Sequence, residues 1–460
     1  MSAPERAAYL VVDLGFGDAG KGTLTDWLVR RYGARRVVRF NGGAQAGHNV
    51  VTDDGRHHTF AQFGAGSFVP GVETHLARTT VLHPLAMLVE ARYLARQGVT
   101  DALDRTTVSE GARVITPFHQ AAGRLRELAR GQGRHGTCGV GVGETVRDAL
   151  AHPDEAVHAG DLTRPEALLR KARAAQERLR EELSEARREA RELPQAGPEL
   201  SLLEDSEAAS RWVSAVEALR PRELVVDDSW LGTQLSEGTT VFEGAQGVLL
   251  DEWWGFHPHT TWSTCTFDNA LTLLREHGFD GPVHRLGVLR SYATRHGEGP
   301  LPTELPTLAP SLPEPHNDAA GWQGTFRVGG FDAVLARYAL AACGGADALA
   351  VTHLDRLTER WPVCTAYRAP PGCDAGTFER DANEPTRVTT LRLGTREQLE
   401  HQERLTQGLL QCKPWGEELE LGGAASQRTE RFVSWLEATL GLPVRVASHG
   451  PTAGDKRWRG

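Results

Sequence analysis

The chain has 460 residues and a net charge of −9. A net-negative chain without a basic region argues against nucleic acid or an anionic membrane as a partner, and no apolar run approaches the roughly 20 residues of a membrane span. The six cysteines are scattered without C-x-x-C pairs and the N-terminus has no signal-peptide core, so we expect reduced thiols and a cytoplasmic protein.

The first predicted elements, over residues 11–50, are a strand, a glycine-rich turn, an amphipathic helix, a second strand and a loop. Glycine lets the turn approach a ligand closely, and a helix that starts near Gly22 would point its N-terminal amides at an anion. Lys21 adds a positive charge for phosphate. This segment therefore predicts a phosphate site, with a ligand-free strand–turn–helix as the alternative.

The turn almost matches a P-loop. Gly15, Gly20 and Lys21 satisfy G-x-x-x-x-G-K, but Gly22 stands where a P-loop has the Ser or Thr that holds Mg²⁺. Asp18 places an acid inside the turn, where it would repel phosphate unless it bound a cation or took a proton. The pattern suggests a site where metal, phosphate and an ionisable substrate meet.

His48 closes the loop after the second predicted strand. We expect Asp18 and His48 at the carboxyl ends of adjacent parallel strands, where open α/β sheets place their sites. A solvated polar residue is the alternative for His48.

Further along the chain, short apolar runs alternate with helical stretches over residues 60–130. Residues 164–193 have apolar side chains at spacings of three and four, which predicts one long surface helix, with a coiled coil as the alternative. Residues 307–316 and 366–387 are Pro-rich or polar and indicate loops. We expect one α/β domain over residues 1–460, with helical insertions at about 75–135 and 164–222.

The turn GFGDAGKG (15–22) resembles the phosphate loop of adenylosuccinate synthetases, and VVRFNGGAQAGHNVV (37–51) is similar to the strand and loop that follow it in that family. The likeness covers nearly the whole chain in the family's order. It continues through GTCGVGVG (136–143), VFEGAQGVLLD (241–251), TRHGEGPLPTEL (294–305), THLDRL (352–357) and ASHGP (447–451).

The resemblance implies an α/β fold with a large, mostly parallel central sheet flanked by helices. It also implies a homodimer and a GTP-dependent carbon–nitrogen ligase that uses Mg²⁺. The reaction would be IMP plus L-aspartate plus GTP giving adenylosuccinate, GDP and phosphate. GTP would phosphorylate the 6-oxo group, and the amine would then displace phosphate, which is a far better leaving group than an amide-like oxygen.

By the same resemblance, Asp18 would abstract the purine N1 proton and bind Mg²⁺ together with Gly47, and His48 would stabilise charge between the 6-oxygen and the γ-phosphate. The implied catalytic residues are Asp18, His48, Lys21 and Gln246. The implied GTP-binding residues are Gly17, Gly20, Lys21, Gly22, His353, Asp355, Ser448, Gly450 and Pro451. The implied acceptor-nucleotide residues are Gln45, Ala46, Thr137, Cys138, Gln246, Leu250 and Thr261. The implied amine-binding residues are Arg327 and Thr303.

Asp355 follows a strand-like run, where the family reads guanine. Its carboxylate can accept hydrogen bonds from guanine N1–H and the exocyclic amine, a donor pair that adenine lacks. A helix N-cap is the structural alternative for Asp355. His353 stands where the family has a lysine, and its imidazole can stack on the purine in place of the lysine stem.

The chain departs from the family pattern at the amine site. The family's arginine-rich aspartate loop corresponds to GWQGTFRVGGFD, in which Arg327 is the one arginine left. Two carboxylates call for cationic forks, so another amine or 6-oxo acceptor stays open beside L-aspartate and IMP. A GTP-binding regulator without catalysis is the alternative from another class, and Asp18 argues against it because binding alone needs no acid in a phosphate cradle.

Overall fold

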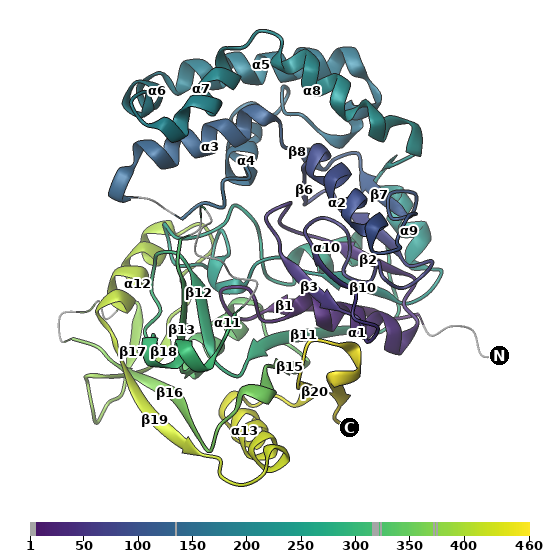
Figure 1. Cartoon of the computed structure of the whole chain (residues 1–460). Helices are drawn as coiled ribbons and strands as arrows, with labels where there is room; N and C mark the ends of the chain where they lie inside the picture. The colour runs from purple at the N-terminus through teal and green to yellow at the C-terminus, as the bar shows by residue number, and fades with distance from the viewer. Residues whose placement is uncertain (1–5, 134–135, 315–321, 323, 371–372, 374–375) are drawn as a thin grey trace.

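The computed structural model describes residues 6–133, 136–314, 322, 324–370, 373 and 376–460. Within these residues, ten strands form a central sheet in the order β21-β20-β15-β11-β1-β10-β2-β5-β7-β9 (Figure 1). All neighbouring pairs are parallel except β20 with β21. In sheet order the strands are Lys456–Trp458, Val444–Ser448, Ala348–Thr352, Val283–Arg290, Ala8–Asp13, Thr240–Glu243, Arg36–Arg39, Glu73–Leu76, Thr106–Ser109 and Val225–Val226. The predicted α/β fold with a large, mostly parallel sheet is confirmed.

Strand β1 shows how the sequence builds the sheet core. Its residues are all buried, as expected of a central parallel strand. Leu10 and Val12 pack on one face with α9, α10 and α11, and Tyr9 and Val11 pack on the other with α1. These helices are α1 (Lys21–Tyr32), α9 (Ser229–Leu235), α10 (Asp268–Glu276) and α11 (Ala333–Ala342). Because the nine strands other than β21 are parallel, their carboxyl ends all lie at the same edge of the sheet.

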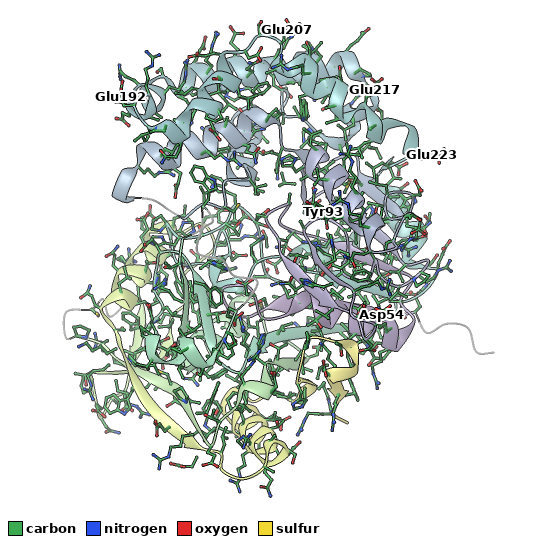
Figure 2. The ribbon with its side chains drawn as sticks, in the orientation of Figure 1. Asp54, Tyr93, Glu192, Glu207, Glu217 and Glu223 are labelled. Carbon is green, nitrogen blue, oxygen red and sulfur yellow. The ribbon has the colours of Figure 1, made fainter. Side chains whose placement is uncertain are left out.

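A helical layer lies on one side of the sheet (Figure 1). Its helices are α2 (Pro84–Arg96), α3 (Pro117–Ala129), α4 (Val142–Ala151), α5 (Pro165–Glu182), α6 (Ser184–Ala190), α7 (Gly197–Glu204) and α8 (Ala208–Val216). All of them except α4 share one hydrophobic cluster with β5 and β7. Its outer surface carries exposed glutamates, of which Glu192, Glu207, Glu217 and Glu223 are labelled in Figure 2.

The C-terminal third adds smaller elements beside the sheet. Its strands are β14 (Phe331–Asp332), β16 (Arg360–Arg368), β17 (Phe378–Arg380), β18 (Arg387–Leu391) and β19 (Lys413–Glu420), and its helices are α12 (Leu399–Gln411) and α13 (Ala425–Leu440). Three strand pairs complete the fold: β3 (His48–Val51) with β4 (His57–Phe60), β6 (Val81–Leu82) with β8 (Arg113–Val114), and β12 (Ala293–His296) with β13 (Phe326–Gly329).

Three sequence predictions of local structure need correction. The helix expected over 164–193 is two helices, because the chain bends at Leu183, whose side chain is fully buried in the helical-layer core. The expected loop 366–387 includes the end of β16, all of β17 and the first residue of β18, because β16 and β17 both pair with β18. Its residues 371, 372, 374 and 375 lie outside the described residues. The expected loop 307–316 includes most of a 3-10 helix, Pro306–Ser311, and its residues 315 and 316 lie outside the described residues.

None of the helices in the described ranges is long and apolar enough to cross a membrane. The division of the chain into one domain with two insertions stays a prediction.

Candidate active site

The phosphate turn is shaped by Asp13, the last residue of β1. Its carboxylate accepts hydrogen bonds from the Gly15 N–H at 2.8 Å and the Ala19 N–H at 2.9 Å, and it pairs with Lys21 Nζ at 3.0 Å. Gly20 precedes α1 in the left-handed region at φ 89°, and no side chain caps the helix there. The first amides of α1 are thus directed at a cavity that Gly20, Lys21 and Gly22 line.

Close packing explains why this turn departs from a P-loop at Gly22. A Cβ added at Gly22 would lie 2.7 Å from His48 Cβ and 2.9 Å from the His48 carbonyl carbon. A Ser or Thr cannot fit there without moving β3. Glycine at this position therefore lets helix α1 touch the strand that carries His48.

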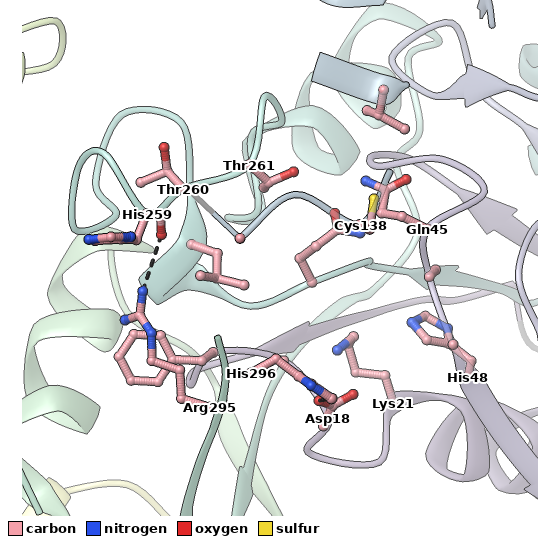
Figure 3. A pocket seen from close by; sticks show the side chains of 18 of the residues that line it. Asp18, Lys21, Gln45, His48, Cys138, His259, Thr260, Thr261, Arg295 and His296 are labelled. Atoms are coloured by element: carbon pink, nitrogen blue, oxygen red, sulfur yellow. Dashed lines mark hydrogen bonds and ion pairs between the residues drawn. The ribbon is translucent and has the colours of Figure 1, made fainter. Parts of the chain in front are cut away.

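Asp18 lies within the turn and is oriented into the cavity beside Lys21 and His296 (Figure 3). Its backbone has φ 60°, and its Oδ2 is 3.5 Å from His296 Nε2. Burial raises the pKa of the Asp18 carboxyl, and the nearby His296, Lys21 and Arg290 oppose that rise. A carboxyl group with a raised pKa, beside a phosphate cradle, is suited to take up a proton.

His48 is the first residue of β3 and is held by Glu243 at the end of β10, with Nδ1 and Oε1 2.7 Å apart. Glu243 is fully buried, and its Oε2 accepts from the Ala65 N–H at 3.0 Å. Burial lowers the pKa of His48 to about 4, although Glu243 opposes this. Despite burial, His48 and Arg39 hold the pKa of Glu243 below its usual range. The resting pair is therefore a carboxylate and a neutral imidazole.

The sequence analysis expected Asp18 and His48 to follow neighbouring strands. The strands that precede them, β1 and β2, are not neighbours in the sheet. Strand β10 lies between β1 and β2 in the sheet. This intervening strand carries Glu243, which contacts His48 and therefore belongs to the site. The sequence analysis placed His48 in a loop, but His48 is the first residue of β3.

Two glutamine side chains lie in the cavity with buried, unpartnered polar atoms. Neither Gln45 Oε1 nor Gln45 Nε2, nor Gln246 Oε1, has a hydrogen-bond partner among the described residues. A buried amide without a partner costs stability, so these groups are suited to bind a ligand. Five non-glycine residues in the described ranges have positive φ, and Asp18, Gln246 and His353 among them line this cavity. Strained backbone commonly gathers at functional sites.

The predicted base-binding residues also line the cavity. His353 follows β15 with φ 57°, and Asp355 lies in the 3-10 helix Leu354–Arg356 rather than at a helix N-cap. Asp355 Oδ2 is 3.1 Å from Arg356 Nε. Ser448 ends β20, and Lys456 Nζ donates to the Gly450 carbonyl at 2.9 Å, which orders the loop beside it.

One cavity gathers almost all the predicted site residues. Its volume is about 1380 Å³, larger than the roughly 300–1,000 Å³ of an ordinary ligand pocket, which leaves room for two nucleotide-sized ligands. The predicted residues that line it are Gly17, Asp18, Gly20, Lys21, Gly22, Gln45, Ala46, Gly47, His48, Thr137, Cys138, Gln246, Leu250, Thr261, His353, Asp355, Ser448, Gly450 and Pro451.

The two predicted amine-binding residues, Arg327 and Thr303, are not among the residues that line the cavity. Arg327 pairs with Glu304 at 2.9 Å and donates to the Gly299 carbonyl at 2.8 Å. Thr303 is buried. Arg295 does line the cavity, but its guanidinium donates to the main-chain carbonyls of Glu298, Pro300 and His259.

Sequence reasoning missed the two acids that position the site, Asp13 and Glu243. Each is the last residue of a buried strand, where a charge is unexpected unless it has a partner. An acid at the end of an apolar strand was therefore the signal in the sequence that could have identified these two residues. His296 carried no such signal, because its approach to Asp18 depends on how β12 lies beside the turn.

The chain is similar to one protein family along nearly its whole length. The family model for adenylosuccinate synthetase matches residues 10–456. The adenylosuccinate synthetase of Chlorobium chlorochromatii is 31% identical over 462 residues, covering 97% of this chain and 96% of the relative. That of Thermobifida fusca is 34% identical over 371 residues, covering 78% of this chain and 81% of the relative.

The chain belongs to the adenylosuccinate synthetase family. Members of this family are GTP-dependent ligases that join IMP and aspartate into adenylosuccinate. The solved adenylosuccinate synthetase of Plasmodium falciparum has the same fold, with a TM-score of 0.77 at 20% identity, covering 98% of this chain and 99% of that one. The succinoaminodeoxyadenylate synthetase of cyanophage S-2L gives 0.58 at 17% identity, covering 99% and 95%.

Proposed function

We propose that this chain activates the 6-oxo group of a purine nucleotide with GTP and couples the activated carbon to an amine, with IMP and L-aspartate as the default substrates. The observation that carries the proposal is the acid inside the phosphate cradle, Asp18 beside Lys21. Membership of a family of GTP-dependent ligases supports the choice of nucleotide.

Asp18 takes the N1 proton of the acceptor, and the electron pair released shifts onto the 6-oxygen. That oxygen attacks the γ-phosphorus of GTP, and GDP leaves. The amine nitrogen then attacks C6, inorganic phosphate leaves, and the amine loses a proton. His48 faces the developing charge, with Glu243 holding its ring from behind.

Lys21 and the first amides of α1 bind the γ-phosphate, with Asp13 fixing the lysine. His353 and Asp355 receive the guanine base. Gln45 and Gln246 turn their unpartnered amides to the acceptor nucleotide. These roles extend the family resemblance to the positions that the cavity brings together.

The donor set at Asp18 fits Mg²⁺, because a cavity-facing carboxylate and a main-chain carbonyl are hard oxygen ligands. Asp18 and Gly47 would hold the ion. When bound, it would neutralise charge on the transferring phosphoryl group. The homodimer and the cytoplasmic location that the resemblance implies stay predictions.

A second candidate function is a ligase of the same mechanism that uses another amine. Aspartate brings two carboxylates, yet Arg327 is already paired with Glu304 and Arg295 is bound to main-chain carbonyls. Residues 299–330 contain no further Arg or Lys. This arrangement favours an amine with fewer carboxylates than aspartate.

The test is product formation by purified protein with GTP, IMP and Mg²⁺, with and without L-aspartate. Adenylosuccinate formation together with phosphate release supports the default assignment. Phosphate release with IMP and another amine, and none with L-aspartate, supports the second candidate. GTP binding without phosphate release for any acceptor and amine would refute both and leave a GTP-binding regulator.

A further inference from the structure

Both ring nitrogens of His353 contact polar side chains, and the chemistry of these side chains shows which nitrogen carries the proton. The Thr352 hydroxyl donates to the Ala19 carbonyl at 2.8 Å, in the phosphate turn next to Asp18. Its oxygen lies 2.9 Å from His353 Nδ1. Because the hydroxyl has one hydrogen and a carbonyl can only accept, the threonine oxygen must accept from Nδ1–H.

The other ring nitrogen faces a group that can only donate. Arg290 Nη2 lies 2.9 Å from His353 Nε2, and a guanidinium has no acceptor. Nε2 must therefore carry a lone pair. The proton sits on Nδ1 and the ring is neutral, which agrees with the direction in which burial shifts its pKa, well below the usual value.

Arg290 is itself fixed on its far side. Its side chain is buried, and Nη2 also contacts Glu314 and the Tyr292 hydroxyl. The Tyr292 ring lies 5.6 Å from the His353 ring at 83°, and the Ser291 hydroxyl donates to the His353 carbonyl at 2.8 Å. The imidazole thus has little freedom to rotate, and its nitrogens are not available to a ligand.

We propose that Thr352 and Arg290 are positioning residues, which lock His353 as a neutral, Nδ1-protonated ring that offers only its face to the nucleotide base. The same contacts join the base pocket to the phosphate turn through the Ala19 carbonyl. The inference deepens the proposed function and rests on it for the identity of the ligand. Base selection then falls to Asp355, because a ring face binds any purine.

The first arm of the test reads the ring directly, in resting protein without nucleotide. In protein labelled with 15N-histidine, the His353 signals are those absent from a His353→Gln variant. We expect a protonated Nδ1 and an unprotonated, hydrogen-bonded Nε2. A proton on Nε2, or an imidazolium at neutral pH, would overturn the proposal whether or not the protein catalyses the proposed reaction.

The second arm compares Thr352→Val with its matched control Thr352→Ser, using calorimetric binding of GTP. Valine has the shape of threonine but cannot accept from Nδ1–H, so we expect about a tenfold or greater loss of GTP affinity and a changed His353 15N signature. Serine keeps the hydroxyl and should stay within about threefold of wild type. Equal behaviour of the two variants, in binding and in the His353 signals, would contradict the positioning role.

Discussion

Glu243 should matter to catalysis only through His48. The two side chains are 2.7 Å apart in a buried pair, with Glu243 fully buried and His48 6% exposed. A hydrogen bond to a charged group contributes about 1.5–3 kcal/mol. If His48 needs that carboxylate to stabilise the charge that develops between the 6-oxygen and the γ-phosphate, Glu243→Gln should lower kcat about 10- to 150-fold. The isosteric amide keeps the packing.

The assay is steady-state phosphate release with saturating GTP and acceptor, for wild type, Glu243→Gln, His48→Ala and the double variant. If Glu243 acts through His48, the double variant should be no slower than His48→Ala alone. Thermal unfolding of each variant separates loss of fold from loss of rate, since Glu243 also accepts from the Ala65 N–H. Additive losses, or a Glu243→Gln enzyme within about threefold of wild type, would refute this reasoning.

Three further predictions follow from the site and the core. Gly22→Ala should lower kcat by about tenfold or more, because its Cβ would lie 2.7 Å from His48 Cβ. Unchanged kinetics would show that β3 can shift without loss of activity. Asp18→Asn should abolish turnover while GTP affinity stays within about threefold, and turnover within about tenfold of wild type would disprove the general-base role. Burial lowers the pKa of His75 to about 3 from 6.5, so the unfolded chain binds the extra proton and the free energy of unfolding falls as pH drops from about 6.5 towards 3. Denaturant unfolding across that range should show this slope reduced by about 1.4 kcal/mol per pH unit in His75→Gln, and an unchanged slope would mean that His75 takes its proton in the folded state.

The sequence predicted which residues gather in the cavity better than it predicted the order of the strands beneath them. Asp18, Lys21 and His48 carry local signals, a glycine-rich turn after an apolar strand and a loop after the next one, so they could be found without a structure. Strand order carries no such signal, because the pairing of β1 with β10 joins residues more than two hundred positions apart. Glu243 was therefore missed, and Asp18 and His48 were placed on neighbouring strands.

Packing decided the other differences. Leu183 continues the apolar spacing of Leu179 and is buried in the same cluster, so the apolar pattern alone does not mark the end of α5. The sequence showed Gly22 only as a departure from the P-loop pattern. The structure gives the reason, because His48 packs directly against Gly22. On the amine side, Arg327 and Thr303, which the resemblance implied, lie outside the cavity lining, and Arg327 is paired with Glu304 instead.

The most direct test of the central claim uses IMP labelled with 18O at the 6-position, in the presence of GTP, Mg²⁺ and the amine that supports turnover. Activation of the 6-oxo group predicts that the label leaves the purine and appears in the released inorganic phosphate. Release of unlabelled phosphate while the amine is joined to the purine would contradict the account, because the 6-oxygen would then never have been bonded to the γ-phosphorus.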